Sequence, residues 1–170
     1  MANIIKEQKL IDNTKRALLK YVFIGDGTQQ ANTTLIDVST LANSLNANGY
    51  IMTSNTDPKS TYRTTIKRIW GNYSGTGYVK LQWHGTSNGE IVVFGNGKVD
   101  IDFESRSDTA VITNPEANTS GDILISTSGV GSSNVFTIFV DLRKDNADYD
   151  AGQSRDPAAF NAGSYAGRNT

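Results

Sequence analysis

The stretch from Tyr62 to Phe103 constrains the fold more than any other part of the chain. Within it, Val79, Leu81 and Trp83 alternate with polar residues, which is the period of a strand with one buried face and one face in water. Three glycine-bearing segments interrupt the stretch, at 72–77, 85–89 and 95–97. Glycine tolerates the positive φ of tight turns, so the stretch predicts four short antiparallel strands. Their expected ranges are 62–70, 78–84, 90–94 and 98–103.

Four further segments have the composition of strands, and their ranges are 16–24, 33–38, 122–127 and 135–142. In the last of these, alternate apolar residues from Phe136 to Leu142 share one face. Residues 39–45 form the one good helical turn, with Ser39 as its expected cap. About eight strands beside so little helix predict an all-β fold, an antiparallel β-sandwich or jelly roll.

A chain of 170 residues suits one domain. We expect residues 1–15 to form an N-terminal arm or a first strand, and residues 16–145 to form the β-sandwich domain. Residues 146–170 are rich in Ala, Gly, Asp and Asn, and their large apolar residues are Tyr149, Phe160 and Tyr165. Such a composition buries too little apolar surface to fold alone, which predicts an extended C-terminal tail.

Charge and composition exclude several classes of partner. The formal net charge of −1 provides no basic field for nucleic acid or an anionic membrane. The chain has no cysteine, so disulfides and thiolate zinc sites are excluded. No apolar run reaches the roughly 18 residues of a membrane helix. The first residues lack the apolar core of a signal peptide, so we expect synthesis in a cytoplasm without an address label.

The candidate catalytic and metal-binding residues are few. His84 is the single histidine and is expected at an exposed strand end. Asp100, Asp102 and Glu104 alternate along one strand and so share a face, where they could bind calcium or act as a carboxylate pair. Lys98 shares that face, and ordinary alternation of buried and solvated residues explains the pattern. We therefore predict no catalytic residue, no metal site and no cofactor.

Aromatic residues and long polar segments are the better candidates for contacts. Trp70, Tyr73 and Tyr78 flank one turn, where they could stack on a sugar or base, cap the core or line a subunit contact. The polar loop 104–120, which contains Pro115, is longer than a usual connection and is a candidate contact loop. The complete set of candidate partner contacts is Trp70, Tyr73, Tyr78, Pro115, Tyr149, Phe160 and Tyr165.

Several segments, in their order along the chain, resemble a family of small virion structural proteins of tailed bacteriophages. They are IDNTKRALLKYVFIGDGT, TTLIDVSTLA, YRTTIKRIWGNYSGTGYVKLQWHGTSNGEIVVFGNG and SGDILISTSGVGSSNVFTIFVDLRK. The resemblance spans most of Ile11–Lys144. The chain departs from the family pattern where His84 follows Trp83 in place of an Asp, and where residues 46–60 look expanded. The tail has no counterpart in that pattern.

The resemblance implies a capsid decoration, or cement, protein. Such a protein binds the outside of the phage head and bridges subunits of the major capsid protein, and we expect it as a homotrimer in the virion after synthesis in the host cytoplasm. Two alternatives remain. One is a neck, tail or baseplate component of the same virion. The other is a carbohydrate-binding β-sandwich module with Trp70, Tyr73 and Tyr78 as its platform.

Overall fold

The computed structural model describes residues 3–45, 51, 62–103, 112–113, 120–145 and 149. In these residues the chain is all-β, apart from one turn of 3-10 helix at Val38–Thr40. No helix among them is long and apolar enough to cross a membrane. The strands are β1 (Ile4–Asp12), β2 (Arg16–Asp26), β3 (Thr33–Ile36), β4 (Thr64–Trp83), β5 (Glu90–Asp102), β6 (Ile112–Thr113), β7 (Ile123–Ser128) and β8 (Ser132–Lys144).

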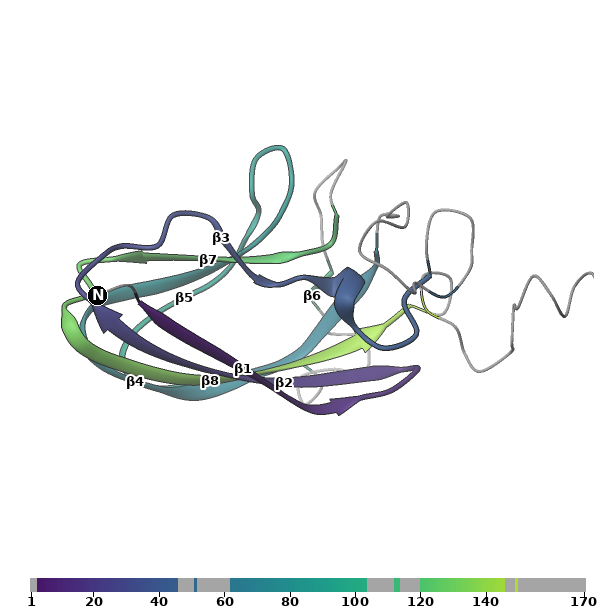
Figure 1. The fold of residues 1–170 in the computed structure, drawn as a ribbon, viewed down its shortest axis with the longest axis horizontal. Helices are drawn as coiled ribbons and strands as arrows, with labels where there is room; N and C mark the ends of the chain where they lie inside the picture. The colour runs from purple at the N-terminus through teal and green to yellow at the C-terminus, as the bar shows by residue number, and fades with distance from the viewer. Residues whose placement is uncertain are drawn as a thin grey trace, which may run out of the picture.

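All the described strand pairs are antiparallel, and the strands form one sheet that folds over on itself. The hydrogen-bonded order is β1-β2-β8-β4-β7-β3, with β5 and β6 also paired to β4. Figure 1 shows two facing layers, with β1, β2 and β8 in one and β3 and β7 in the other. This arrangement confirms the predicted antiparallel β-sandwich. We call the layer that contains β1, β2 and β8 the larger layer.

Strand β4 joins the two layers because it belongs to both. Its first part pairs with β8, from Thr64 to Ser74, and its last part pairs with β7, from Tyr78 to Trp83. β5 follows the opposite edge of β4 through both layers. The prediction of four short strands in this stretch is therefore wrong, since two long strands bend where turns were expected. Only the expected turn at 85–89 separates two strands.

Glycine makes the bend of β4 possible. Gly77 has φ of +79°, and a Cβ atom there would lie 2.2 Å from the carbonyl oxygen of Ser128. Gly97 on the neighbouring strand has φ of +117°, but no atom lies within 4 Å of its ideal Cβ position. Both glycines thus have the positive φ on which the turn predictions rested. The close approach to Ser128 shows that Gly77 also packs β4 against the connection from β7 to β8.

The core lies between the layers, and the strand register gives its composition row by row. In the larger layer Leu19 lies opposite Val140, which lies opposite Ile69, and all three side chains are completely buried. The predicted inward face of β8 is confirmed, because Phe136, Ile138, Val140 and Leu142 are all fully buried. The other layer contributes Val79, Leu81, Trp83, Ile123 and Ile125.

Of the two alternatives for residues 1–15, an arm or a first strand, the structure shows the strand, since residues 4–12 form the edge strand β1. The prediction of Ser39 as the cap of the helical turn needs correction. The helical turn has Asp37 as its N-cap, and the Asp37 carboxylate accepts a hydrogen bond from the backbone N–H of Ser39. Asp37 precedes the turn by one residue, so it can reach the free N–H groups that an N-cap satisfies.

Candidate functional site

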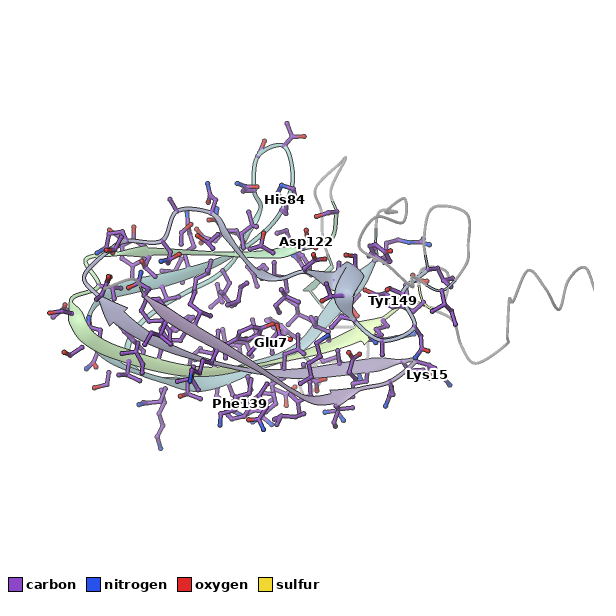
Figure 2. The ribbon with its side chains drawn as sticks, viewed as in Figure 1. Glu7, Lys15, His84, Asp122, Phe139 and Tyr149 are labelled. Atoms are coloured by element: carbon purple, nitrogen blue, oxygen red, sulfur yellow. The ribbon has the colours of Figure 1, made fainter. Side chains whose placement is uncertain are left out.

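Polar, aromatic and apolar side chains lie side by side on the outward side of the larger layer. We call this side the outer face. Its central row runs Lys20, Phe139, Trp70 and Asp100 across β2, β8, β4 and β5. Side chains that face each other across paired strands project to the same side of a sheet, so these four are neighbours. Figure 2 shows Phe139 on the side of its layer that faces away from the other layer.

A stack of two aromatic rings lies at the centre of the outer face. The rings of Trp70 and Phe139 have centroids 5.1 Å apart and planes that differ by 4°. The guanidinium carbon of Arg68 lies 5.1 Å from the centroid of the Trp70 ring, and this guanidinium makes two hydrogen bonds of 3.0 and 2.8 Å to Asp100. The hydrogen bonds from Arg68 hold the pKa of the Asp100 carboxyl below its usual value. A cation–π contact, an aromatic stack and an ion pair therefore fix this patch in one arrangement.

Apolar side chains extend the patch toward the end of the sheet where β2 leads into its turn. Ile24 and Val135 face each other across β2 and β8 and are 41% and 38% exposed. Val22 is half-buried and lies between Ile24 and the central row. Branched and aromatic residues on the solvent side of a sheet form a surface that a partner protein can cover.

The opposite end of the outer face is basic. Arg16 lies directly opposite Arg143 across β2 and β8, and Arg143 lies directly opposite Thr65 across β8 and β4. Arg16 donates two hydrogen bonds, of 2.8 and 2.7 Å, to the carboxylate of Asp141. Arg143 is exposed, and its guanidinium has no ion pair or hydrogen bond among the described residues.

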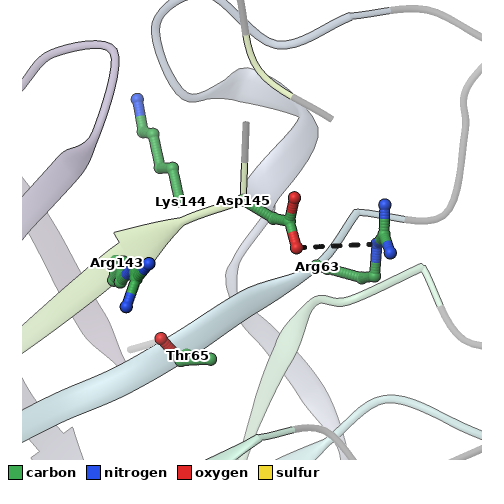
Figure 3. Close-up of a pocket in the computed structure, with 5 residues that line it drawn as sticks. All are labelled: Arg63, Thr65, Arg143, Lys144 and Asp145. Atoms are coloured by element: carbon green, nitrogen blue, oxygen red, sulfur yellow. Dashed lines mark ion pairs between the residues drawn. The ribbon is translucent and has the colours of Figure 1, made fainter. Parts of the chain in front are cut away.

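Two cavities adjoin Arg143, each of about 310 Å³. One is lined by Lys15, Arg16, Lys67 and Arg143. The other is lined by Arg63, Thr65, Arg143, Lys144 and Asp145, and Figure 3 shows it with the 3.9 Å ion pair between Arg63 and Asp145. The larger layer therefore ends in a cationic surface, although the whole chain has a net charge of −1.

The predicted aromatic platform does not form. Trp70 lies on the outer face, but Tyr73 is 1% exposed and packs in the core against Phe136. Tyr78 is 45% exposed and lies beyond the bend of β4, in the layer that contains β3 and β7. Tyr73 points inward because it lies three positions after Trp70, and an odd offset along an extended strand places two side chains on opposite faces. A partner could therefore reach Trp70 and Tyr78 but not Tyr73.

Tyr149 was expected to contact a partner from the tail, and this expectation is wrong. Its side chain is fully buried, its hydroxyl donates a 3.0 Å hydrogen bond to the carbonyl of Val38, and its ring packs against Tyr62. Burial of the ring beneath the 3-10 turn explains why it is not available to a partner. The other predicted contacts, Pro115, Phe160 and Tyr165, lie outside the described residues.

The structure brings together three polar residues that the sequence did not connect. His84 Nδ1 lies 2.9 Å from the Ser120 hydroxyl, which donates a 2.6 Å hydrogen bond to Asp122. Figure 2 shows His84 and Asp122 near each other beside the loop between β4 and β5. The Ser120 hydroxyl donates its hydrogen bond to the aspartate, whereas the hydroxyl of a serine nucleophile donates its hydrogen bond to the histidine. Asp122 also accepts the N–H of Val38, so this chain of hydrogen bonds joins β7 to the 3-10 turn.

Sequence reasoning missed Phe139, Arg16 and Arg143. Arg16 and Phe139 lie on strands that were predicted, and Arg143 follows the strand predicted at 135–142 by one residue. Their signal was the outward-facing half of the alternation in these segments. Those alternations were read only for their buried face. Asp100 and Asp102 do lie on the solvated side of β5, where Asp100 pairs with Arg68, while Glu104 lies outside the described residues.

No protein-family model matches the chain, and no curated protein matches it. Among solved structures, the chain is similar to one described as "CBM4 structure and function". The two are 9% identical, the alignment covers 85% of this chain and 95% of that chain, and the TM-score is 0.24. A likeness of this size carries no argument about this chain.

Proposed function

We propose that this chain is a non-enzymatic binding module that attaches to a partner protein through the outer face. The observation that carries the proposal is the stacked pair of Trp70 and Phe139, which stands on a solvent-facing sheet and is held in place by Arg68. Large aromatic residues and arginine are the residue types that contribute most to protein interfaces. Their fixed arrangement reduces the side-chain entropy that a partner must remove on binding.

We further propose that the partner is the major capsid protein of a tailed phage and that the chain is a capsid decoration protein in the virion. The support is the ordered set of segments in Ile11–Lys144 that resembles small virion structural proteins. A rigid β-sandwich that contacts several neighbouring subunits gains strength because each contact raises the effective concentration of the next. A homotrimer suits this role, since closed symmetry covers exposed sheet edges.

Carbohydrate binding is the second candidate, because the indole of Trp70 lies on an accessible sheet face. Sugars stack on aromatic ring faces that water can reach. Here the ring of Trp70 already contacts Phe139 and Arg68, and Tyr73 is in the core. The remaining platform is small, so a protein partner is the better assignment for this face.

The copy number of the chain in purified virions tests the proposal. We expect a ratio to the major capsid protein near that of a lattice component, measured by mass spectrometry with isotope-labelled reference peptides. A small fraction of that ratio would instead assign the chain to the neck, tail or baseplate. Complete absence from purified virions would overturn the virion assignment, and specific retention on a glycan array would then favour carbohydrate binding.

A further inference from the structure

We propose that the basic end of the outer face is a binding site for an acidic peptide segment, with Arg143 as its central residue. The proposal names the chemistry of the partner and therefore rests on the proposed function. Its parts are the cross-strand row Arg16, Arg143 and Thr65, and the two cavities that share Arg143.

The first argument is the placement of like charges. Arg16 and Arg143 lie directly opposite each other on neighbouring strands, an arrangement that destabilises a sheet unless an anion compensates it. Asp141 compensates Arg16 through two hydrogen bonds. No described residue does the same for Arg143. The Arg143 guanidinium is therefore a planar, permanently charged hydrogen-bond donor that a carboxylate can engage through two N–H groups.

The second argument is a buried hydroxyl. The Oγ1 atom of Thr65 is buried and has no hydrogen-bond partner among the residues that the structure describes. Thr65 lines the cavity next to Arg143, and Figure 3 shows its oxygen on the side that faces Arg143. A buried hydroxyl without a partner costs free energy, and a carboxylate oxygen bound beside Arg143 would accept a hydrogen bond from this hydroxyl.

The third argument concerns the shape of the site. Lys15, Arg16 and Lys67 line one cavity with Arg143, whereas Arg63 and Thr65 line the other. The row from Arg16 to Thr65 crosses three neighbouring strands, so it is roughly 10 Å long and exceeds the reach of one oxyanion. An extended segment that carries more than one carboxylate fits such a row better than a phosphate ion does. The half-buried Leu18, next to Arg16 on the outward side of β2, offers apolar surface beside it.

Calorimetric titration with hexaglutamate tests the proposal on the full chain at low salt. We expect hexaglutamate to bind and hexaglutamine not to bind. R143Q should weaken the binding by about tenfold or more, as expected for one lost charge-assisted contact. T65V keeps the shape of the side chain and should weaken the binding by about threefold, as expected for one lost hydroxyl contact. K98Q is the matched control, because it removes the same charge as R143Q. Lys98 is exposed on β5 in the same layer, opposite Asn72.

Three results would overturn the proposal. The first is equal weakening by R143Q and K98Q, which would mean that the peptide responds only to overall charge. The second is hexaglutamate binding that R143Q leaves unchanged. The third is tighter binding of inorganic phosphate or of a hexathymidylate than of hexaglutamate, which would assign the site to phosphate groups. Because the titration uses no virion, its failure is separate from a failure of the virion assignment.

Discussion

The ammonium of Lys144 donates a 2.5 Å hydrogen bond to the carboxylate of Asp12, so the last residue of β8 is tied to the last residue of β1 across the intervening strand β2. The Lys144 side chain is fully buried, and the ammonium also donates hydrogen bonds to the carbonyls of Asn13 and Ala42. It also lies 5.0 Å from the centre of the Tyr149 ring. Burial lowers the pKa of Lys144, whereas the hydrogen bond and charge of Asp12 oppose that shift.

Replacement of Lys144 by methionine should destabilise the fold by about 3 kcal/mol, because one Asp12 oxygen and two carbonyls lose the hydrogen bonds from the ammonium. The other Asp12 oxygen keeps its hydrogen bond from the backbone N–H of Ala42. Urea unfolding monitored by tryptophan fluorescence measures the change. The double variant D12N/K144M removes both charges and should be more stable than K144M by about 1 kcal/mol or more. Equal stability of the two variants would contradict a coupled pair.

Alkaline pH should destabilise the protein through Tyr21. Burial, followed by the charge of Glu7 and the hydrogen bond from Tyr21 to Glu7, raises the pKa of this phenol far above its ordinary value of 10.0. Above about pH 10, Tyr21 loses its phenolic proton in the unfolded chain but keeps it in the folded chain. The unfolded state then binds fewer protons, so stability falls as pH rises, by up to about 1.4 kcal/mol per pH unit.

Y21F removes this titration. Urea unfolding between about pH 9 and pH 12 should therefore show a shallower fall in stability for Y21F than for the wild-type protein. The variant should be the less stable of the two near neutral pH, since it lacks the 2.8 Å hydrogen bond to Glu7, and the difference should shrink as the pH rises. Parallel pH curves for the two proteins would contradict the assignment to Tyr21.

The bend of β4 should require glycine at position 77 for two reasons, the positive φ and the close approach of Ser128. G77A and G97A both place a Cβ atom at positive φ, which costs about 1–3 kcal/mol. Only G77A also brings that atom against the carbonyl of Ser128, where overpacking adds about 1–3 kcal/mol. Chemical unfolding should find G77A less stable than G97A by about 2 kcal/mol. Similar values for both variants would mean that the clash relaxes without cost.

Alternation was enough to predict the fold class and the strands at 16–24, 33–38, 122–127 and 135–142. It failed at Asn72–Gly77 and Gly95–Gly97, because a glycine-rich segment gives the same pattern in a hairpin turn and in a bend of one long strand. The choice between them depends on the partner strands, since β7 and β8 together line one edge of β4. That pairing is a long-range property, and no local pattern encodes it.

The candidate site was predictable in part. Trp70 was identified from its residue type, but its partner Phe139 lies far along the chain and meets it only through the register of β4 and β8. Arg16 and Arg143 were visible as basic residues at strand ends, yet their opposition depends on the register of β2 and β8. Tyr149 was misplaced because tail composition does not reveal that a single aromatic residue fills a space between Val38, Tyr62 and Lys144.

The outer face should be needed for attachment but not for folding. W70S/F139S removes the stacked pair and should lower stability by only about 1–2 kcal/mol, because both side chains are partly exposed. Occupancy on capsids should nevertheless fall strongly, as measured by co-sedimentation with particles that lack the native protein. V93S is the control, since Val93 is 45% exposed on the outward side of the other layer, opposite Lys80. Equal occupancy of both variants would remove the outer face from the attachment site.

Truncation of the tail should affect folding only when it removes Tyr149. Y149A should cost about 3–5 kcal/mol, because a fully buried aromatic ring leaves a cavity between Tyr62 and Lys144. Y149F keeps the ring but loses the hydrogen bond to Val38, and it should cost about 1 kcal/mol. Deletion of residues 146–170 should lower the melting temperature as Y149A does, by about 2–4 °C for each kcal/mol. Deletion of residues 151–170 should leave it unchanged, because their composition is poor in aliphatic residues. If both deletions melt at the wild-type temperature, the ring does not hold the fold together.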